Sequence, residues 1–259
     1  SFFAFIRNPL INSKGENTSV SFGFVNSLWS ILQNYDPTHL AVVFDTAAPT
    51  HRHETYKEYK STRAKMPEDM ADQLPRLHEV VEAMNIPLIE KDGVEADDVI
   101  ATLANRAADK SYDVLILTSD KDFNQLVTDK IKILKPQKTG SDLEIIDKDG
   151  VVEKLGVPPE KVIDLMGLMG DTSDNIPGIP GVGPKTALKL IDQFGSLEAV
   201  LQNADEITAK GVRNKVKDNI ENARLSKELV TILTDVDIDL KVDDLKRGEV
   251  KADRLREIF

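Results

Sequence analysis

The chain has 259 residues, of which 41% are hydrophobic and 30% are charged, as in an ordinary globular protein. No apolar run approaches the ~20 residues of a membrane span, no leader resembles a signal peptide, and cysteine is absent. We therefore expect a cytoplasmic protein without disulfides or a membrane partner. Its 44 acidic and 33 basic residues give a net charge of −11, which argues against nucleic-acid binding unless the bases gather apart from the acids.

Apolar strands alternate with amphipathic helices over the first 155 residues. We expect helices at 20–32, 67–84, 94–109 and 121–127, and strands at 39–44, 87–89, 113–118 and 131–134. This order predicts an α/β fold with a mainly parallel central sheet flanked by helices. The densely apolar start, Ser1–Ile6, reads as the middle of an element with nothing before it to pair with.

Helical patterns dominate from about Val151 onward. We expect helices at 158–169, 184–193, 196–203 and 212–232, and no low-complexity linker precedes them. The chain therefore divides into an α/β domain at 1–155 and a helical region at 156–259 that packs against it.

Four acidic groups stand at predicted strand ends, helix starts or turns. They are Asp45; Glu95, Asp97 and Asp98; Asp120 and Asp122; and Asp171 and Asp174. Strand carboxyl ends and the following helix starts share one edge of a parallel sheet, so these groups can converge. Clustered carboxylates without His or Cys select Mg²⁺ or Mn²⁺, and two such ions about 4 Å apart suit phosphodiester hydrolysis.

Each acidic group also has a simpler explanation. Glu95, Asp97 and Asp98 could serve only to stabilise the dipole of the helix that they open. Asp120 and Asp122 could form a turn, and Asp45 alone carries no information. Only the combination of four groups favours a metal site.

The segment at 51–65 is basic although the chain is acidic overall. It holds five Lys or Arg residues against two Glu, with two tyrosines interleaved. Cations for phosphates and rings for bases are typical of a groove for single-stranded nucleic acid. The spacing of Tyr56, Lys60 and Arg63 predicts one shared helical face, although a solvated amphipathic helix is an alternative.

A glycine-rich turn precedes the predicted helix at 184–193. Its sequence, Gly181-Val182-Gly183-Pro184-Lys185-Thr186, has the form of a helix-hairpin-helix turn at about 176–193. Such a turn lets the backbone approach a phosphate and holds DNA without reading its sequence. The basic residues Lys210, Arg213, Lys215 and Lys217 either extend this phosphate track or form a solvated face.

Together these motifs resemble the 5′-nuclease family, in particular the 5′→3′ exonuclease domains of bacterial DNA polymerases. The resemblance covers nearly the whole chain in the family's order. It is carried by Val43-Phe44-Asp45, Arg52-His53-Glu54 with Tyr59-Lys60 and Arg63, Glu95-Ala96-Asp97-Asp98, Thr118-Ser119-Asp120-Lys121-Asp122, and Gly170-Asp171-Thr172-Ser173-Asp174-Asn175 with the glycine hairpin.

The resemblance implies a metal-dependent 5′→3′ exonuclease and flap endonuclease of DNA replication and repair. Its substrate is DNA with a 5′ single-stranded flap, or a 5′ end at a duplex junction, and the enzyme is expected to be a monomer. A helical arch at about 50–75 passes the 5′ strand, and the hairpin binds K⁺ while it grips the duplex.

The same resemblance implies a role for each candidate residue. A first ion is held by Glu95, Asp97, Asp98, Asp120 and Asp122, a second is held or positioned by Asp122, Asp171 and Asp174, and Asp45 acts near both through water. The scissile phosphate is steered by Arg52, Lys57, Lys60 and Arg63. The DNA is contacted by Tyr56, Gly181, Val182, Gly183, Lys185, Thr186 and Lys215.

One departure from the family pattern concerns the N-terminus. The family begins with a strand that carries an Ile-Asp-Gly-like sequence and a further ligand Asp, and this sequence begins after that point. We expect a gap between the strands at 39–44 and 113–118, and weakened support for Phe2, Phe3 and Phe5. Two rival functions stay open: a DNA-binding protein without chemistry, and a metal-dependent phosphatase for small molecules.

Overall fold

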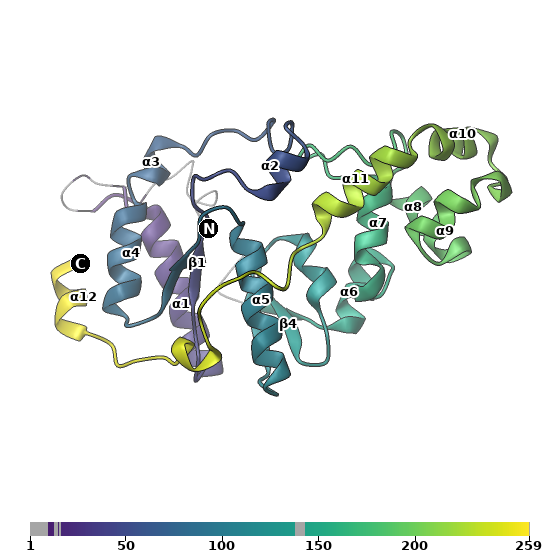
Figure 1. Ribbon diagram of the computed structural model, residues 1–259. Coiled ribbons are helices and arrows are strands. Elements are labelled where there is room, and N and C mark those ends of the chain that lie inside the picture. The colour runs from purple at the N-terminus through teal and green to yellow at the C-terminus, as the bar shows by residue number, and fades with distance from the viewer. Residues whose placement is uncertain (1–9, 13–14, 16, 138–142, 259) are drawn as a thin grey trace.

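The computed structural model describes residues 10–12, 15, 17–137 and 143–258 of the chain. The apolar Phe2, Phe3 and Phe5 lie outside the described residues. The structure has the expected α/β part and a helical part that extends from one side of it (Figure 1).

Two small sheets form the centre of the α/β part. The first pairs β1 (Val42–Phe44) with β2 (Leu88–Glu90) in parallel, and the second has the order β3 (Val114–Leu117), β4 (Ile131–Pro136), β5 (Leu143–Ile146). β3 and β4 are parallel, whereas β5 is an antiparallel edge strand. The expected mainly parallel sheet is therefore present, and β5 is a strand that the sequence pattern did not predict.

The expected gap lies between the two sheets. Among the described residues, β1 does not pair with β3, although helix α5 (Ala96–Asp109) contacts both strands and bridges the two sheets. The side chains of Leu115 and Leu117 on β3 are each 39% exposed, whereas strands of a parallel sheet are usually buried on both faces. The gap prediction is confirmed for the part of the chain that the structure describes.

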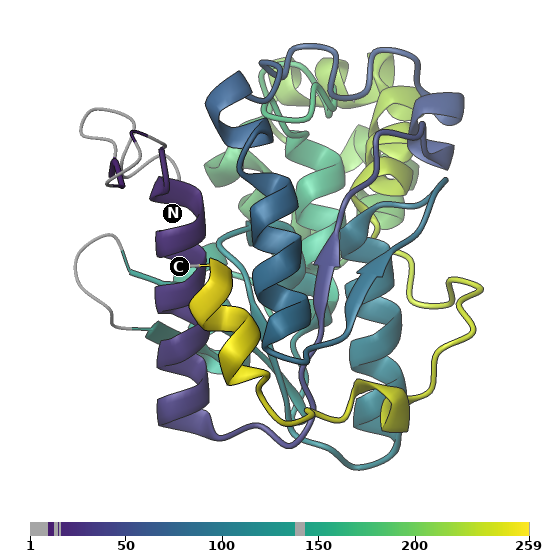
Figure 2. The same ribbon diagram turned by 90° about the vertical axis from the view of Figure 1, so that its left-hand side faces the viewer.

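Helices α1 (Ser19–Tyr35) and α4 (Leu74–Ala83) lie side by side over the first sheet (Figure 2). A small core of Leu28, Val80, Val81, Met84 and Ile86 fills the space between them. The last helix, α12 (Ala252–Ile258), returns from the far end of the chain to pack on α4. The single helix expected at 67–84 is instead two, α3 (Glu68–Ala71) and α4, because Pro75 starts a new first turn.

The helical part shares one large core with the second sheet. Its helices are α6 (Lys148–Leu155), α7 (Val162–Met169), α8 (Pro184–Phe194), α9 (Leu197–Gln202), α10 (Lys210–Asp218) and α11 (Ile220–Val230). The core runs without a break from Ile116 and Ile133 to Leu168 and Leu197, so the helices are packed on the sheet rather than tethered to it. The helix expected at 212–232 is interrupted at Asn219, whose φ of −130° is not helical.

None of the described helices is long and apolar enough to span a membrane.

Candidate active site

Three of the four acidic groups meet in one open cleft beside the end of β3. The cleft has a volume of about 470 Å³ and is lined by Asp97, Thr118, Ser119, Asp120, Lys121, Asp171 and Ser173. Asp97 lies in the first turn of α5, Asp120 precedes the short helix η2 (Lys121–Leu126), and Asp171 follows α7. We call this hollow the acidic cleft. It brings together side chains that are far apart in the sequence.

The carboxylates of the acidic cleft repel one another. Burial raises the pKa of Asp97 to about 7, helped by the negative charges of Asp120, Asp45 and Glu95. Burial also raises the pKa of Asp122 to about 8, and the charge of Asp120 adds to this effect. The Oδ1 atom of Asp122 is buried without a hydrogen-bond partner. A bound divalent cation would relieve both the repulsion and the unpaired oxygen, so the residues present fit the predicted metal.

Basic side chains now neutralise part of this negative charge. Lys121 Nζ lies 2.7 Å from Asp171 Oδ2, and Lys60 Nζ lies 2.8 Å from Glu95 Oε1. Arg63 Nη2 lies 2.5 Å from Asp174 Oδ1. Among the described residues, no three acidic or imidazole side chains form a ready-made metal site. Ion binding would therefore have to displace these ammonium and guanidinium groups from the carboxylates.

Tyr59 connects two of the acidic groups. Its hydroxyl lies 3.2 Å from Glu95 Oε2 and 3.4 Å from Asp174 Oδ2, and only 4% of the residue is exposed. Burial and the two carboxylates raise the pKa of Tyr59 far above its usual value, so the hydroxyl keeps its proton. Tyr59 therefore acts as a neutral donor between Glu95 and Asp174.

The basic segment is not the continuous helix that the spacing predicted. Only α2 (His51–Thr55) is helical, and residues 57–62 form successive turns. Lys60 has a φ of 55°, and its backbone N–H donates to Asp174 O at 2.9 Å. This left-handed residue breaks any helix, so the expected shared face of Tyr56, Lys60 and Arg63 is wrong. Lys60 and Arg63 nevertheless reach the acidic residues by way of the turns.

Tyr56 and Lys57 lie away from these contacts. The Tyr56 hydroxyl bonds Glu58 Oε2 at 3.1 Å, and Lys57 is exposed. Asp45 is also exposed, and its Oδ1 accepts the N–H of Ala96 at 2.8 Å, which anchors the start of α5. The structure thus places Lys57 where it can meet solvent or a ligand, and gives Asp45 a defined bond beside Asp97.

Arg52 and Asp98 are not in the acidic cleft. They form a buried two-pronged ion pair, with Nη1 2.7 Å from Oδ2 and Nη2 2.8 Å from Oδ1, and their exposed fractions are 2% and 0%. The pKa of Arg52 is raised although burial opposes this, because Asp98 stabilises the charged form. This arrangement does not support the expectation that Asp98 binds a metal and that Arg52 steers a phosphate, since both oxygens are occupied and the guanidinium is enclosed.

The hairpin follows the acidic loop directly. Gly170 (φ 70°) and Gly178 (φ 58°) cross so closely that a Cβ on Gly170 would lie 2.5 Å from Ile176 O. Gly183 precedes α8, and a Cβ there would meet nothing within 4 Å. The side chains of Lys185 and, in part, Thr186 are accessible, so the turn presents an open backbone and a cation.

Two other predicted DNA contacts are engaged within the protein, one by a buried side chain and one by an exposed side chain. Val182 is 2% exposed and belongs to the core, so only its backbone lies at the turn. Lys215 reaches back from α10 and places Nζ 3.3 Å from Gly181 O. Lys215 therefore supports the turn in this structure.

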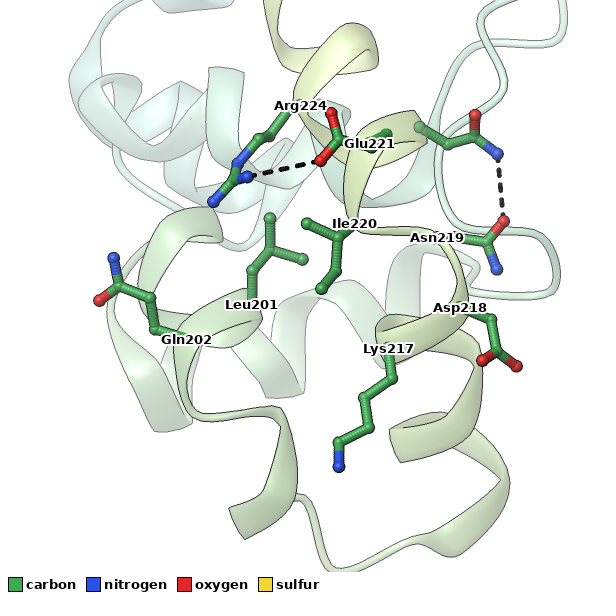
Figure 3. Close-up of a pocket in the computed structure, with 9 residues that line it drawn as sticks. Leu201, Gln202, Lys217, Asp218, Asn219, Ile220, Glu221 and Arg224 are labelled. Atoms are coloured by element: carbon green, nitrogen blue, oxygen red, sulfur yellow. Dashed lines mark hydrogen bonds and ion pairs between the residues drawn. The ribbon is translucent and has the colours of Figure 1, made fainter.

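A second pocket, of about 510 Å³, lies between α9, α10 and α11 and shares no lining residue with the acidic cleft (Figure 3). Three of its four charged lining residues form ion pairs, Arg224 with Glu221 and with Glu198 outside the lining, and Lys217 with Asp205. Because these charges are neutralised by neighbouring side chains, we assign this pocket no role in the chemistry of the acidic cleft.

Sequence reasoning missed three residues of the site. Tyr59 and Lys121 belong to the motifs named above, but a helical spacing favours Tyr56 over Tyr59. Lys121 follows Asp120 and balances Asp171, which a count of carboxylates does not show. Gln125, whose side chain donates to Asp122 O at 3.0 Å, carried no sequence signal.

Known proteins resemble this chain over its whole length. Residues 1–156 match the family described as "5′-3′ exonuclease, N-terminal resolvase-like domain", and residues 157–253 match "5′-3′ exonuclease, C-terminal SAM fold". The "5′-3′ exonuclease" of Aquifex aeolicus is 40% identical over 257 residues, which is 99% of this chain and 86% of that protein. The DNA polymerase I of Bacillus subtilis is 41% identical over 260 residues, and the chain spans 30% of its length.

The fold also matches solved structures. A bacteriophage T5 flap endonuclease, described as a pseudo-enzyme-product complex with DNA and metal ions, superposes with a TM-score of 0.76. The two are 23% identical, and the match covers 99% of this chain and 95% of that one. At this identity the likeness shows a shared fold.

Proposed function

This chain belongs to the 5′-3′ exonuclease family, and on that basis we propose that it is a divalent-metal-dependent 5′-nuclease that cleaves DNA at 5′ flaps and 5′ ends. The observation that carries the proposal is the acidic cleft, where Asp97, Asp120 and Asp171 meet. A cleft of crowded carboxylates, bordered by Lys60 and Arg63, suits a substrate phosphate held by metal ions.

We infer that Glu95, Asp97, Asp120 and Asp122 hold one Mg²⁺ or Mn²⁺ ion. Asp171 and Asp174, together with Asp122, would hold or position a second, and Asp45 would act through water. When bound, such ions activate water and stabilise the charge on the attacking and leaving oxygens. Asp98 is left out of this assignment, because Arg52 and a backbone N–H occupy its oxygens.

The basic residues would exchange partners during the reaction. Lys60 and Arg63, now paired with Glu95 and Asp174, would turn to the scissile phosphate once cations neutralise those carboxylates. Lys57 and Tyr56 would follow the 5′ strand through the segment at 50–75. The open turn at Gly181–Gly183, with Lys185 and Thr186, would hold the duplex, with K⁺ as a further ligand of the hairpin.

A cleavage assay tests this proposal. The chain is incubated with a 5′-flap DNA in Mg²⁺, in Mn²⁺ and in EDTA, beside Asp122→Asn and the exposed control Asp129→Asn. We expect metal-dependent release of the flap by the unchanged chain and by the control, and a loss of orders of magnitude in Asp122→Asn. Cleavage in EDTA, or equal rates in all three proteins, would contradict the metal assignment.

Binding without cleavage is the second candidate, and the gap between β1 and β3 favours it. No strand of the described part of the chain fills this gap, and a metal site beside it can lack a ligand. Tight flap binding with no product in either metal would support this candidate.

A further inference from the structure

The last two residues of α11 and the three residues that follow it bond side chains beside the acidic cleft through their backbone groups. We call Leu229–Leu233 the strap. Its polar backbone groups bond three side chains from distant parts of the chain, Arg52, Asp98 and Gln125. The strap is thus the place where the helical part, the basic segment and the acidic residues meet.

Arg52 and Asp98 hold the strap to α5. Arg52 donates from Nε to Leu229 O at 3.0 Å and from Nη2 to Thr231 O at 2.7 Å. The N–H of Leu233 donates to Asp98 Oδ1 at 2.8 Å. Arg52 Nη1 also lies 3.5 Å from Glu95 Oε2, so the guanidinium group that bonds the strap also contacts a proposed metal ligand. A lysine could not make this planar, many-sided contact.

Gln125 holds the strap to η2. Its Nε2 donates to Val230 O at 2.9 Å, and its Oε1 accepts the N–H of Ile232 at 2.9 Å. The same Nε2 lies 3.0 Å from Asp122 O. One amide therefore ties the strap to the backbone of Asp122, another proposed ligand.

From these contacts we propose that the strap sets the distance between two proposed metal ligands, Glu95 at the start of α5 and Asp122 in η2. Arg52, Asp98 and Gln125 are then positioning residues. Arg52 contacts both Glu95 and the strap, and Gln125 bonds both the backbone of Asp122 and the strap. Because α11 packs along α7, which leads into Asp171, the strap also links the hairpin region to the cleft. This inference rests on the proposed metal-dependent function, but none of the three side chains needs to touch metal or DNA.

The test measures Mn²⁺ binding by calorimetry, melting temperature and flap cleavage on the full chain. Gln125→Leu should fold, because the residue is only half-buried, and Gln33→Leu on the exposed face of α1 is the matched control. Loss of a residue that orients metal ligands typically weakens metal affinity by roughly 10- to 100-fold, and we expect that range for Gln125→Leu. The number of bound ions should not change, and saturating Mn²⁺ should recover much of the cleavage rate.

Asp98→Asn separates a positioning role from a ligand role. We expect weaker Mn²⁺ binding with an unchanged number of ions, whereas Asp97→Asn should lose an ion. Loss of an ion in Asp98→Asn at an unchanged melting temperature would overturn the proposal.

A paired apolar replacement, Arg52→Met with Asp98→Leu, separates positioning from stability, because apolar pairs can replace a buried ion pair without loss of stability. We expect this double variant to melt near the unchanged chain and still bind Mn²⁺ weakly. Normal Mn²⁺ affinity in the double variant and in Gln125→Leu would overturn the inference alone. No Mn²⁺ binding by the unchanged chain would overturn the proposed function, and the inference with it.

Discussion

Lys60 and Glu95 form an ion pair in which the ammonium nitrogen lies 2.8 Å from Oε1, in a place where only 19% and 8% of the two side chains are exposed. Glu95 is a proposed metal ligand, and Lys60 is proposed to orient the substrate phosphate. In this pair, Lys60 blocks Glu95 from a metal ion, and Glu95 blocks Lys60 from a phosphate. Without ligands, the two opposite charges neutralise each other, and the binding of a metal ion or a phosphate has to break this pair.

The first prediction concerns Lys60→Ala. Removing the ammonium leaves Glu95 free of its competitor, so Mn²⁺ should bind more tightly in the absence of DNA. Flap cleavage should nevertheless slow by orders of magnitude, because the phosphate loses its cation. Calorimetry and single-turnover cleavage measure the two effects.

Lys110→Ala is the matched control, since Lys110 follows the last turn of α5 and pairs with the exposed Asp243. It removes the same charge and should change neither quantity. Weaker Mn²⁺ binding in Lys60→Ala would show that Lys60 does not compete with the metal.

The second prediction concerns pH and metal. In the folded chain without metal, the pKa values of Asp97 and Asp122 are about 7 and about 8, above the usual 3.8. The folded state therefore holds protons that the unfolded state has released, so its stability falls as pH rises from about 4 toward 8. Because metal binding requires ionised carboxylates, the rise in melting temperature on adding Mg²⁺ should be larger at pH 8.5 than at pH 6.

Asp122→Asn should flatten this decline, because the replaced amide does not titrate. Asp129→Asn changes an exposed carboxyl whose pKa is lowered by Lys148, and it should keep the decline. Melting curves between pH 4 and pH 9 in EDTA provide the measurement. An Asp122→Asn curve parallel to that of the unchanged chain would exclude Asp122 as a source of the pH dependence.

The third prediction separates the binding of duplex DNA from the cleavage of flaps. A Cβ at Gly183 would meet no atom within 4 Å, so Gly183→Leu should fold normally and block the approach of a phosphate to the turn. Binding of duplex DNA should weaken, while Mn²⁺ affinity stays unchanged. Lys185→Ala should lower the slope of log affinity against log salt by about 1, as expected for one lost phosphate contact.

Arg63→Ala should show the opposite pattern, with slow cleavage of flaps and nearly normal duplex affinity. Filter binding in Ca²⁺ and cleavage in Mg²⁺ measure the two properties separately. Equal losses of binding and rate in Gly183→Leu and Arg63→Ala would refute this division between the hairpin and the basic segment.

The sequence predicted the order of elements and the convergence of acidic groups, because strand ends and helix starts must share an edge in a parallel sheet. It did not reveal which acidic side chains line the cleft. Asp97 and Asp98 are neighbours in one helical turn, yet Asp97 lines the cleft while Asp98 turns inward to Arg52. That choice depends on Leu229 and Thr231, more than 100 residues away, which no local pattern reports.

Backbone conformation limited the sequence reasoning in a second place. The positive φ of Lys60 is a tertiary result, stabilised by its N–H bond to Asp174 O, and no propensity of lysine predicts it. With that turn in place, Tyr59 points into the core between two carboxylates, and Tyr56 does not. A helical spacing therefore selects Tyr56, whereas the turn at Lys60 places Tyr59 beside the acidic residues.

The last prediction concerns the gap between β1 and β3. Among the described residues, no strand pairs with the facing edges of β1 and β3, and Leu115 and Leu117 are partly exposed, so an additional parallel strand would gain hydrogen bonds and bury apolar surface. A longer form of the chain, extended ahead of Ser1 by an apolar strand with a carboxylate at its end, should melt at a higher temperature. It should also cleave flaps faster in Mg²⁺, because the cleft gains a ligand. Amide hydrogen exchange should slow in the extended form at Val43 and Leu115, whose N–H groups point away from β2 and β4 because those of Val42 and Val114 bond to them. Identical exchange, melting and cleavage in the two forms would show that the gap is closed in another way and that the acidic cleft is complete without a further carboxylate.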